Sequence, residues 1–114
     1  MSNGLELDVL RAGAQAIVRA EGPIDISTAP ALRERVVDLV STGVTRIVLN
    51  LEATSYVDAA GVDTIVRAFK LLSAHDGTLS VVCPQEHLVK LFDVSDLSDA
   101  FHIYATLEEA VAGD

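Results

Sequence analysis

Two short apolar segments separated by a stretch of helix length constrain the fold of this chain most. Residues 46–51 (Arg-Ile-Val-Leu-Asn-Leu) and 79–83 (Leu-Ser-Val-Val-Cys) are apolar on consecutive positions, as in strands that are covered on both faces of a sheet. Between them, apolar residues recur every three or four positions: Val62, Ile65, Val66, Phe69 and Leu72. This spacing predicts an amphipathic helix, and the connection is long enough for a parallel crossover.

The segments on either side extend the same alternation of strands and helices. The alternating residues 5–10 and the segment 15–20 predict an initial hairpin. A helix is expected to begin at Ser27 or Thr28, with Pro30 in its first turn, and to end at Gly43. A third helix (residues 88–92), a last strand (101–104) and a terminal helix capped by Thr106 follow, with an acidic loop at 93–99. The expected order is ββαβαβαβα, in an α/β fold with a mixed sheet layered with helices.

Size and charge limit the domain count and the kinds of partner. The 114 residues are expected to form a single domain, 1–114. The net charge is -9 and the eight basic residues are scattered, which argues against nucleic acid and against insertion into an anionic membrane. The N-terminus has no signal-peptide pattern and no segment has the length of a membrane span. Cys83 has no second cysteine to pair with, which favours a buried thiol in a reducing compartment, so we expect a cytoplasmic protein.

The sequence carries no arrangement typical of an enzyme. His75, His87 and His102 lack metal-ligand spacing to one another or to Cys83. The acidic residues of the 93–99 loop lack the spacing of a calcium loop, and the dispersed glycines form no phosphate-binding loop. We therefore expect no catalytic residue, no metal and no cofactor.

Four segments in order resemble the STAS domain, in particular the small stand-alone anti-sigma-factor antagonists. Residues 22–25 (Gly-Pro-Ile-Asp) with 28–32 (Thr-Ala-Pro-Ala-Leu) are similar to the family's Gly-x-Leu-Asp loop and first helix. Residues 47–51 resemble its central strand, and 81–83 with 89–95 its last long strand and third helix. Residues 56–62 (Tyr-Val-Asp-Ala-Ala-Gly-Val) fall where the family has Asp-Ser-Ser-Gly-Leu-Gly. The resemblance covers nearly the whole chain and implies a STAS-like fold.

The resemblance also implies a function. Such proteins bind an anti-sigma factor, a serine kinase of ATPase type, and thereby release its sigma factor; phosphorylation of the second serine of the turn ends the interaction. Ala60 stands at that position here, and alanine has no hydroxyl to phosphorylate. The residues expected to bind the partner are Asp25, Ser27, Thr28, Asp58, Ala59, Ala60, Gly61, Val62, Asp63 and Thr64.

Several alternatives stay open at this point. The chain could be an antagonist locked in its binding state, a STAS subunit of a stress-signalling or lipid-transport complex, or a small-ligand-binding STAS domain. Regulation could act through Thr54, Ser55 or Thr64, and the chain could form a homodimer. Asp63 replaces the second glycine of the family turn. It is either an ordinary acidic residue in the first helical turn, favourable to the helix dipole, or a permanent charge that mimics the phosphate, which we consider the weaker interpretation.

Overall fold

The computed structural model describes residues 4–94 and 102–113. Within them the chain forms six strands and four helices in the order ββαββαβαβα. Their bounds are β1 Glu6–Ala12, β2 Gln15–Ile24, α1 Ala29–Ser41, β3 Arg46–Asn50, β4 Thr54–Val57, α2 Ala59–Ala74, β5 Thr78–Val82, α3 Glu86–Val94, β6 His102–Tyr104 and α4 Leu107–Ala112. The predicted α/β class and mixed sheet are confirmed.

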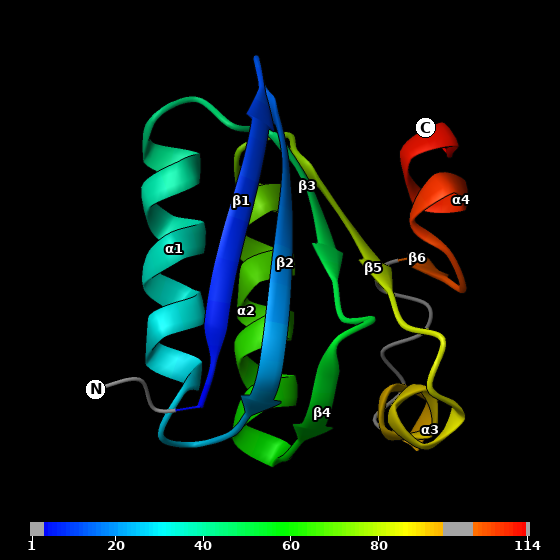
Figure 1. Ribbon diagram of the computed structural model, residues 1–114. Helices are drawn as coiled ribbons and strands as arrows, with labels where there is room; N and C mark the ends of the chain where they lie inside the picture. The colour runs from blue at the N-terminus through cyan, green and yellow to red at the C-terminus, as the bar shows by residue number, and fades with distance from the viewer. Residues whose placement is uncertain (1–3, 95–101, 114) are drawn as a thin grey trace.

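The sheet has the strand order β1-β2-β3-β5-β6, and β4 pairs with the end of β2. The β1–β2 hairpin is antiparallel, whereas β3, β4, β5 and β6 each pair in parallel. The carboxyl ends of the parallel strands therefore lie at one edge of the sheet, at the bottom of Figure 1, where α1, α2 and α3 begin. Edges of this kind bring separate loops together, which is why they commonly carry binding sites.

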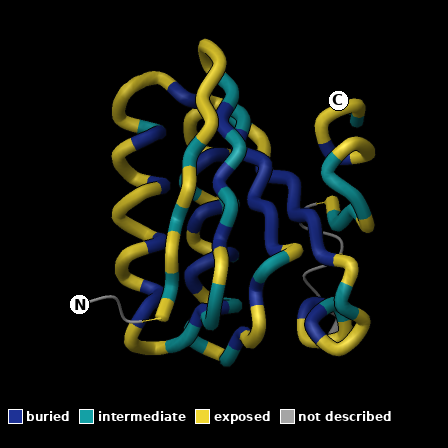
Figure 2. The backbone as a smooth tube through the Cα atoms, in the orientation of Figure 1, coloured by how far each residue is buried: buried dark blue, intermediate teal, exposed yellow. Residues whose placement is uncertain are grey.

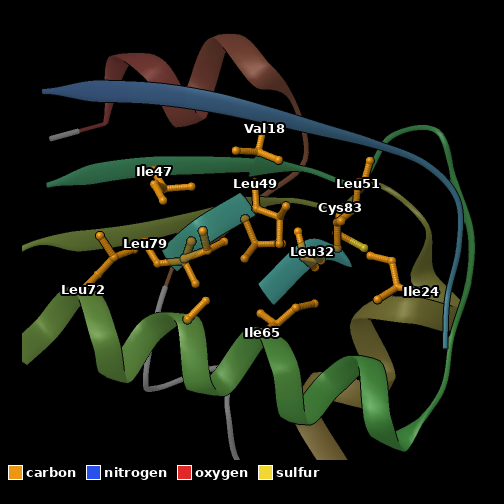
Figure 3. Packing of buried hydrophobic residues seen from close by; sticks show 14 of the residues in the cluster. Val18, Ile24, Leu32, Ile47, Leu49, Leu51, Ile65, Leu72, Leu79 and Cys83 are labelled. Atoms are coloured by element: carbon orange, nitrogen blue, oxygen red, sulfur yellow. The ribbon is translucent and has the colours of Figure 1, made fainter. Parts of the chain in front are cut away.

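The main core lies between the sheet and helices α1 and α2. Leu32 from α1 and Ile65 and Leu72 from α2 are at most 1% exposed and pack with Ile47 and Leu49 of the central strand (Figure 3). Figure 2 shows the same pattern along the backbone, with β3 and β5 buried over most of their length. The continuous apolar sequence of these two strands is thus explained by cover on both faces.

The second face of the sheet is covered by the short helix α4. Val48, Val82 and Ala110 form a separate buried cluster there. Thr106 and Glu109 make the reciprocal capping box that starts the helix, which confirms the predicted cap. The guanidinium of Arg46 donates to the carbonyl of Ala110 at 3.0 Å and also to that of Gly113, so this arginine holds the carboxyl end of α4 against β3.

Three predicted boundaries differ from the structure. The loop expected after residue 51 contains β4, which pairs with β2. Strand β2 continues past the predicted segment 15–20 to Ile24, through an irregularity between Gly22 and Pro23. The acidic loop expected at 93–99 begins too early, because its first two residues belong to α3; its remainder lies outside the described residues.

Candidate docking site

Asp58 organises the turn that precedes α2. It occupies the N-cap position, and its Oδ1 accepts from the backbone N–H of Gly61 at 2.9 Å, as is typical of aspartate at this position. Its Oδ2 accepts from the backbone N–H of Ile26 at 3.2 Å. The backbone N–H of Asp58 itself donates to the carbonyl of Ile24 at 3.2 Å. One side chain therefore joins the start of α2 to the loop that precedes α1.

The loop before α1 is held by Asp25. Its Oδ1 accepts from the Ser27 hydroxyl at 2.7 Å and from the backbone N–H groups of Ser27 and Thr28 at 3.0 and 3.1 Å. These hydrogen bonds, with that from the Ser27 hydroxyl contributing most, lower the pKa of Asp25 below its ordinary value. These hydrogen bonds favour the ionised form of the Asp25 carboxylate.

Thr28 stands at the N-cap position of α1, but its side chain makes no capping hydrogen bond. The expectation that its hydroxyl caps the helix is therefore wrong. Its Oγ1 accepts instead from the backbone N–H of Asp25 at 2.8 Å and lies 2.9 Å from the carbonyl of Pro23, to which it donates. The hydroxyl is used inside the loop, and Thr28 is 1% exposed, so it supports the site from beneath. Pro30 lies in the first turn, as predicted.

Gly61 is required by a close approach of two chain segments. A Cβ at this position would lie 2.4 Å from the carbonyl oxygen of Ile24 and 2.8 Å from Cγ1 of Val57, distances that side chains do not tolerate. The start of α2 therefore lies directly on the end of β2. Ala59, just before it, is exposed, and Ala60 is partly exposed, so the methyl groups of both residues lie at the surface of this joint.

An apolar hollow of about 570 Å³ lies between the start of α2 and helix α3. Val62 of α2 and Leu91 of α3 line it, together with Tyr56 of β4. Tyr56 is 55% exposed and Leu91 is 37% exposed. Large apolar side chains that stay this exposed beside a hollow are typical of interaction surfaces.

A second hollow, of about 320 Å³, lies on the other side of the turn, between α2 and α1. It contains Ala60, Asp63 and Thr64 from α2, and Ile26, which is 77% exposed, from the loop before α1. Ala60 and Asp63 lie three residues apart on α2, and both line this hollow. The turn thus lies between two hollows at one end of the molecule.

Asp63 is the fifth residue of α2, so the expectation that it stands in the first turn is wrong. Its Oδ2 lies 2.7 Å from Nε of Arg67, one turn further along, and both side chains are exposed. Such exposed pairs stabilise a helix by about 0.3–0.5 kcal/mol. Since Arg67 compensates its charge, Asp63 resembles a doubly charged phosphate still less than a free carboxylate would.

The hydroxyl groups near the turn differ in accessibility. Thr54 is 3% exposed and its Oγ1 donates to the carbonyl of Ala20 at 2.8 Å, and Thr64 is 7% exposed. Neither hydroxyl offers ready access to a modifying enzyme. Ser55 and Ser27 are exposed.

The structure brings all ten predicted site residues to one edge of the sheet, on the loop before α1 and the first turns of α2. Sequence analysis missed the residues that line the hollows beside them, namely the large side chains of Ile26, Tyr56 and Leu91 and the imidazole of His87. The available signal was their position in the chain: Ile26 directly follows Asp25, and Tyr56 lies two residues before Asp58.

Among residues 4–94 and 102–113, no group of three or more His, Cys, Asp or Glu side chains is placed to hold a metal ion. None of the described helices is long and apolar enough to cross a membrane.

The fold and this edge define the class of protein. The model of the STAS domain matches residues 7–110, and the chain belongs to the STAS domain family. Within it, the chain is 33% identical over 107 residues to the anti-sigma-B factor antagonist of Bacillus subtilis (strain 168), a match that covers 94% of this chain and 97% of that protein.

Solved structures show the same fold. An anti-sigma factor antagonist from Thermotoga maritima superimposes with a TM-score of 0.86 at 23% identity, covering 92% of this chain and 91% of that one. The Bacillus cell fate determinant SpoIIAA in its phosphorylated form gives a TM-score of 0.73 at 25% identity, with 94% and 96% of the two chains covered. The predicted family and fold are confirmed.

Proposed function

We propose that this chain is an anti-sigma factor antagonist that docks an anti-sigma factor of the ATPase-type serine kinase class, releases its sigma factor, and cannot be released by phosphorylation at position 60. It acts as a binding module rather than as an enzyme, in the cytoplasm. The single observation that carries this proposal is the double hydrogen bond of Asp58, to Gly61 and to Ile26. It joins the loop before α1 to the start of α2 and so forms one surface on which a partner can dock.

The joint does not depend on the side chain of residue 60. Its contacts are made by the carboxylate of Asp58, by backbone groups of Ile24 and Ile26, and by the missing side chain of Gly61. We call the loop before α1 and the first turns of α2 the docking edge. An alanine in place of a serine at position 60 therefore leaves the docking edge formed. The apolar hollow beside Tyr56 and Leu91 supplies area that an interface can bury, and such buried apolar centres carry most of the affinity in protein interfaces.

What Ala60 removes is the means of release. A phosphate on the second residue of α2 would lie near free backbone N–H groups and the positive end of the helix, where anions are tolerated. It would also add about -1.5 to -2 charge. In a docked interface that charge must lose its water or meet like charges, so the fold survives while the complex breaks. Without a hydroxyl at position 60, we expect the complex to persist in the presence of ATP.

The test uses purified chain and each anti-sigma factor that the host encodes, with ATP. We expect the wild-type chain to bind at least one of them and to receive no phosphate at residue 60. The variant Ala60→Ser should bind the same factor and become phosphorylated on the new serine, as located by mass spectrometry. Ala59→Ser is the matched control, because it adds the same hydroxyl one residue earlier; we expect no transfer there. If the wild type binds none of the factors and Ala60→Ser is not phosphorylated by any, the proposal fails.

The same missing hydroxyl also favours a second candidate, a STAS subunit of a permanent assembly that needs no phosphate-driven release, such as a stress-signalling or lipid-transport complex. A small-ligand-binding STAS domain is the remaining alternative. Co-purification from the host separates them. A kinase-type ATPase in the recovered complex supports the antagonist, transporter subunits support the assembly, and a bound small molecule with no protein partner supports the ligand-binding domain.

A further inference from the structure

A groove runs between α1 and α2 on the side of these helices that faces away from the sheet. It consists of the 320 Å³ hollow beside Ala60 and a second hollow of about 160 Å³, which share Arg33, Thr64 and Arg67 as lining residues. We call it the α1–α2 groove. It begins at Ala60, so it is continuous with the docking edge described above. It continues along both helices to Val37 and Leu71.

The charge of this groove is opposite to that of the chain as a whole. The chain has 17 acidic and 8 basic residues, but the charged side chains that line the groove are two arginines and one aspartate. Asp63 lies 2.7 Å from Arg67 and compensates it. The side chain of Arg33 has no hydrogen bond or ion pair with any residue that the structure describes. The groove therefore keeps one uncompensated positive charge, that of Arg33.

Among the six arginines, only Arg33 combines a place in the groove with the lack of a described partner. Four of them have intramolecular partners: Arg11 donates to Thr42, Arg19 to Glu21, Arg46 to Ala110 and Arg67 to Asp63. Arg35 resembles Arg33 in being exposed on α1 and in having no partner among the described residues, but it does not line the groove. Arg35 is therefore a matched control.

Apolar side chains flank Arg33 along the groove. Ile26 at one end is 77% exposed, and Val37, one turn after Arg33, is 45% exposed. A partner segment complementary to this surface would carry a carboxylate opposite the guanidinium of Arg33, with apolar side chains on both sides of that carboxylate. Arginine pairs with carboxylates through two parallel hydrogen bonds. A phosphate backbone or an anionic membrane fits poorly, since the rest of the molecule is strongly acidic and would repel it.

We infer that the α1–α2 groove is a second part of the docking edge and receives an acidic, amphipathic segment of the anti-sigma partner, with a partner carboxylate bound to Arg33. This inference rests on the proposed function, because the partner is the same protein. It extends the interface from the turn at Ala60 along the helices, and it gives Arg33 a role in partner choice, since a partner with a basic segment at this point would be repelled.

The test compares Arg33→Glu with Arg35→Glu, using the anti-sigma factor that wild-type chain binds most tightly. Both variants change the net charge of the chain equally, so long-range repulsion is matched. We expect Arg33→Glu to raise the Kd by about tenfold or more, as reversal of a paired interfacial charge does, and Arg35→Glu to raise it less than about threefold. Added salt should weaken wild-type binding more steeply than binding of Arg33→Gln. Thermal unfolding of each variant checks that the fold is intact.

The outcomes separate the two proposals. If the wild-type chain binds no anti-sigma factor, the proposed function fails and the inference fails with it. If the wild type binds and both charge reversals raise the Kd equally, the groove is not part of the interface, while the proposed function stands. Sedimentation of the chain alone tests whether a second copy of the chain occupies the groove. If the chain forms a dimer that Arg33→Glu dissociates, and the affinity for the partner is unchanged, the groove binds a second copy and the inference is overturned.

Discussion

Replacement of Asp58 tests the joint between α2 and the loop before α1 most directly. Asp58→Ala removes the cap on Gly61 and the acceptor for Ile26. Loss of an N-cap costs about 1 kcal/mol, and loss of a backbone hydrogen bond to a charged group at a partly exposed site costs about 0.5–1.5 kcal/mol. We therefore expect the free energy of unfolding to fall by about 1.5–2.5 kcal/mol.

Asp58→Asn divides this loss into its two parts. Asparagine caps helices about as well as aspartate, so the bond from Gly61 remains. Its amide nitrogen cannot accept from the backbone N–H of Ile26, so the part of the loss that belongs to this bond, about 0.5–1.5 kcal/mol, remains. We expect a smaller loss of stability, about 0.5–1.5 kcal/mol, from this variant.

Urea unfolding measures the free energies, and native-state amide exchange measures the two sites separately. Exchange at the Ile26 amide should accelerate in both variants, whereas exchange at the Gly61 amide should accelerate only in Asp58→Ala. Asp63→Ala is the control, because it removes only an exposed pair with Arg67 and should cost about 0.5 kcal/mol or less. A loss below about 0.5 kcal/mol in Asp58→Ala, or equal losses in the two Asp58 variants, would refute the two-bond account.

Three further predictions concern the same edge. Gly61→Ala should destabilise the fold by about 1–3 kcal/mol despite the better helix propensity of alanine, because the added Cβ would lie 2.4 Å from the Ile24 carbonyl and 2.8 Å from Val57; thermal unfolding measures this, and unchanged stability would contradict it. Ser27→Ala should move the NMR titration midpoint of the Asp25 carboxyl upward, since the Ser27 hydroxyl contributes most to its lowered pKa. A carboxyl whose pKa is lower in the folded state than in the unfolded state stabilises the fold at pH values above its unfolded pKa, and this stabilisation is lost as the pH falls through its folded pKa. The free energy of unfolding of Asp25→Asn should therefore fall less steeply in acid than that of the wild type.

The elements that sequence analysis predicted have local signals in the chain. The continuous apolar runs of β3 and β5 indicate strands covered on both faces, and the packing of α1, α2 and α4 explains them. The caps Asp58 and Thr106 each accept from a helix N–H three residues further along the chain. When a hydrogen bond joins residues within one helical turn, both partners lie close together in the sequence, so the bond can be predicted from it.

The elements that were missed depend on distant parts of the chain. Strand β4 has four residues with only its first and last buried, a pattern without alternation, and it forms because the extended end of β2 offers a free edge. The bond from Ile26 to Asp58 joins residues 32 positions apart. Thr28 was expected to cap a helix, but its hydroxyl oxygen accepts from the backbone N–H of Asp25 instead. Tertiary contacts determine strand β4 and the bond from Ile26 to Asp58, and such contacts leave no periodic pattern in the sequence.

The contacts at the docking edge also explain how the chain can lack a phosphorylatable residue at position 60 and still keep the surface on which a partner docks. Every described hydrogen bond that fixes the turn is made by a group other than the side chain of Ala60. A serine there would add a hydroxyl at a partly exposed position without removing any of these bonds. Residue 60 can therefore change between serine and alanine while Asp58 and Gly61 keep the edge in place. For this reason Ala60→Ser is a test by gain of function: a folded, phosphorylatable variant requires that the kinase-facing geometry was already present in the chain.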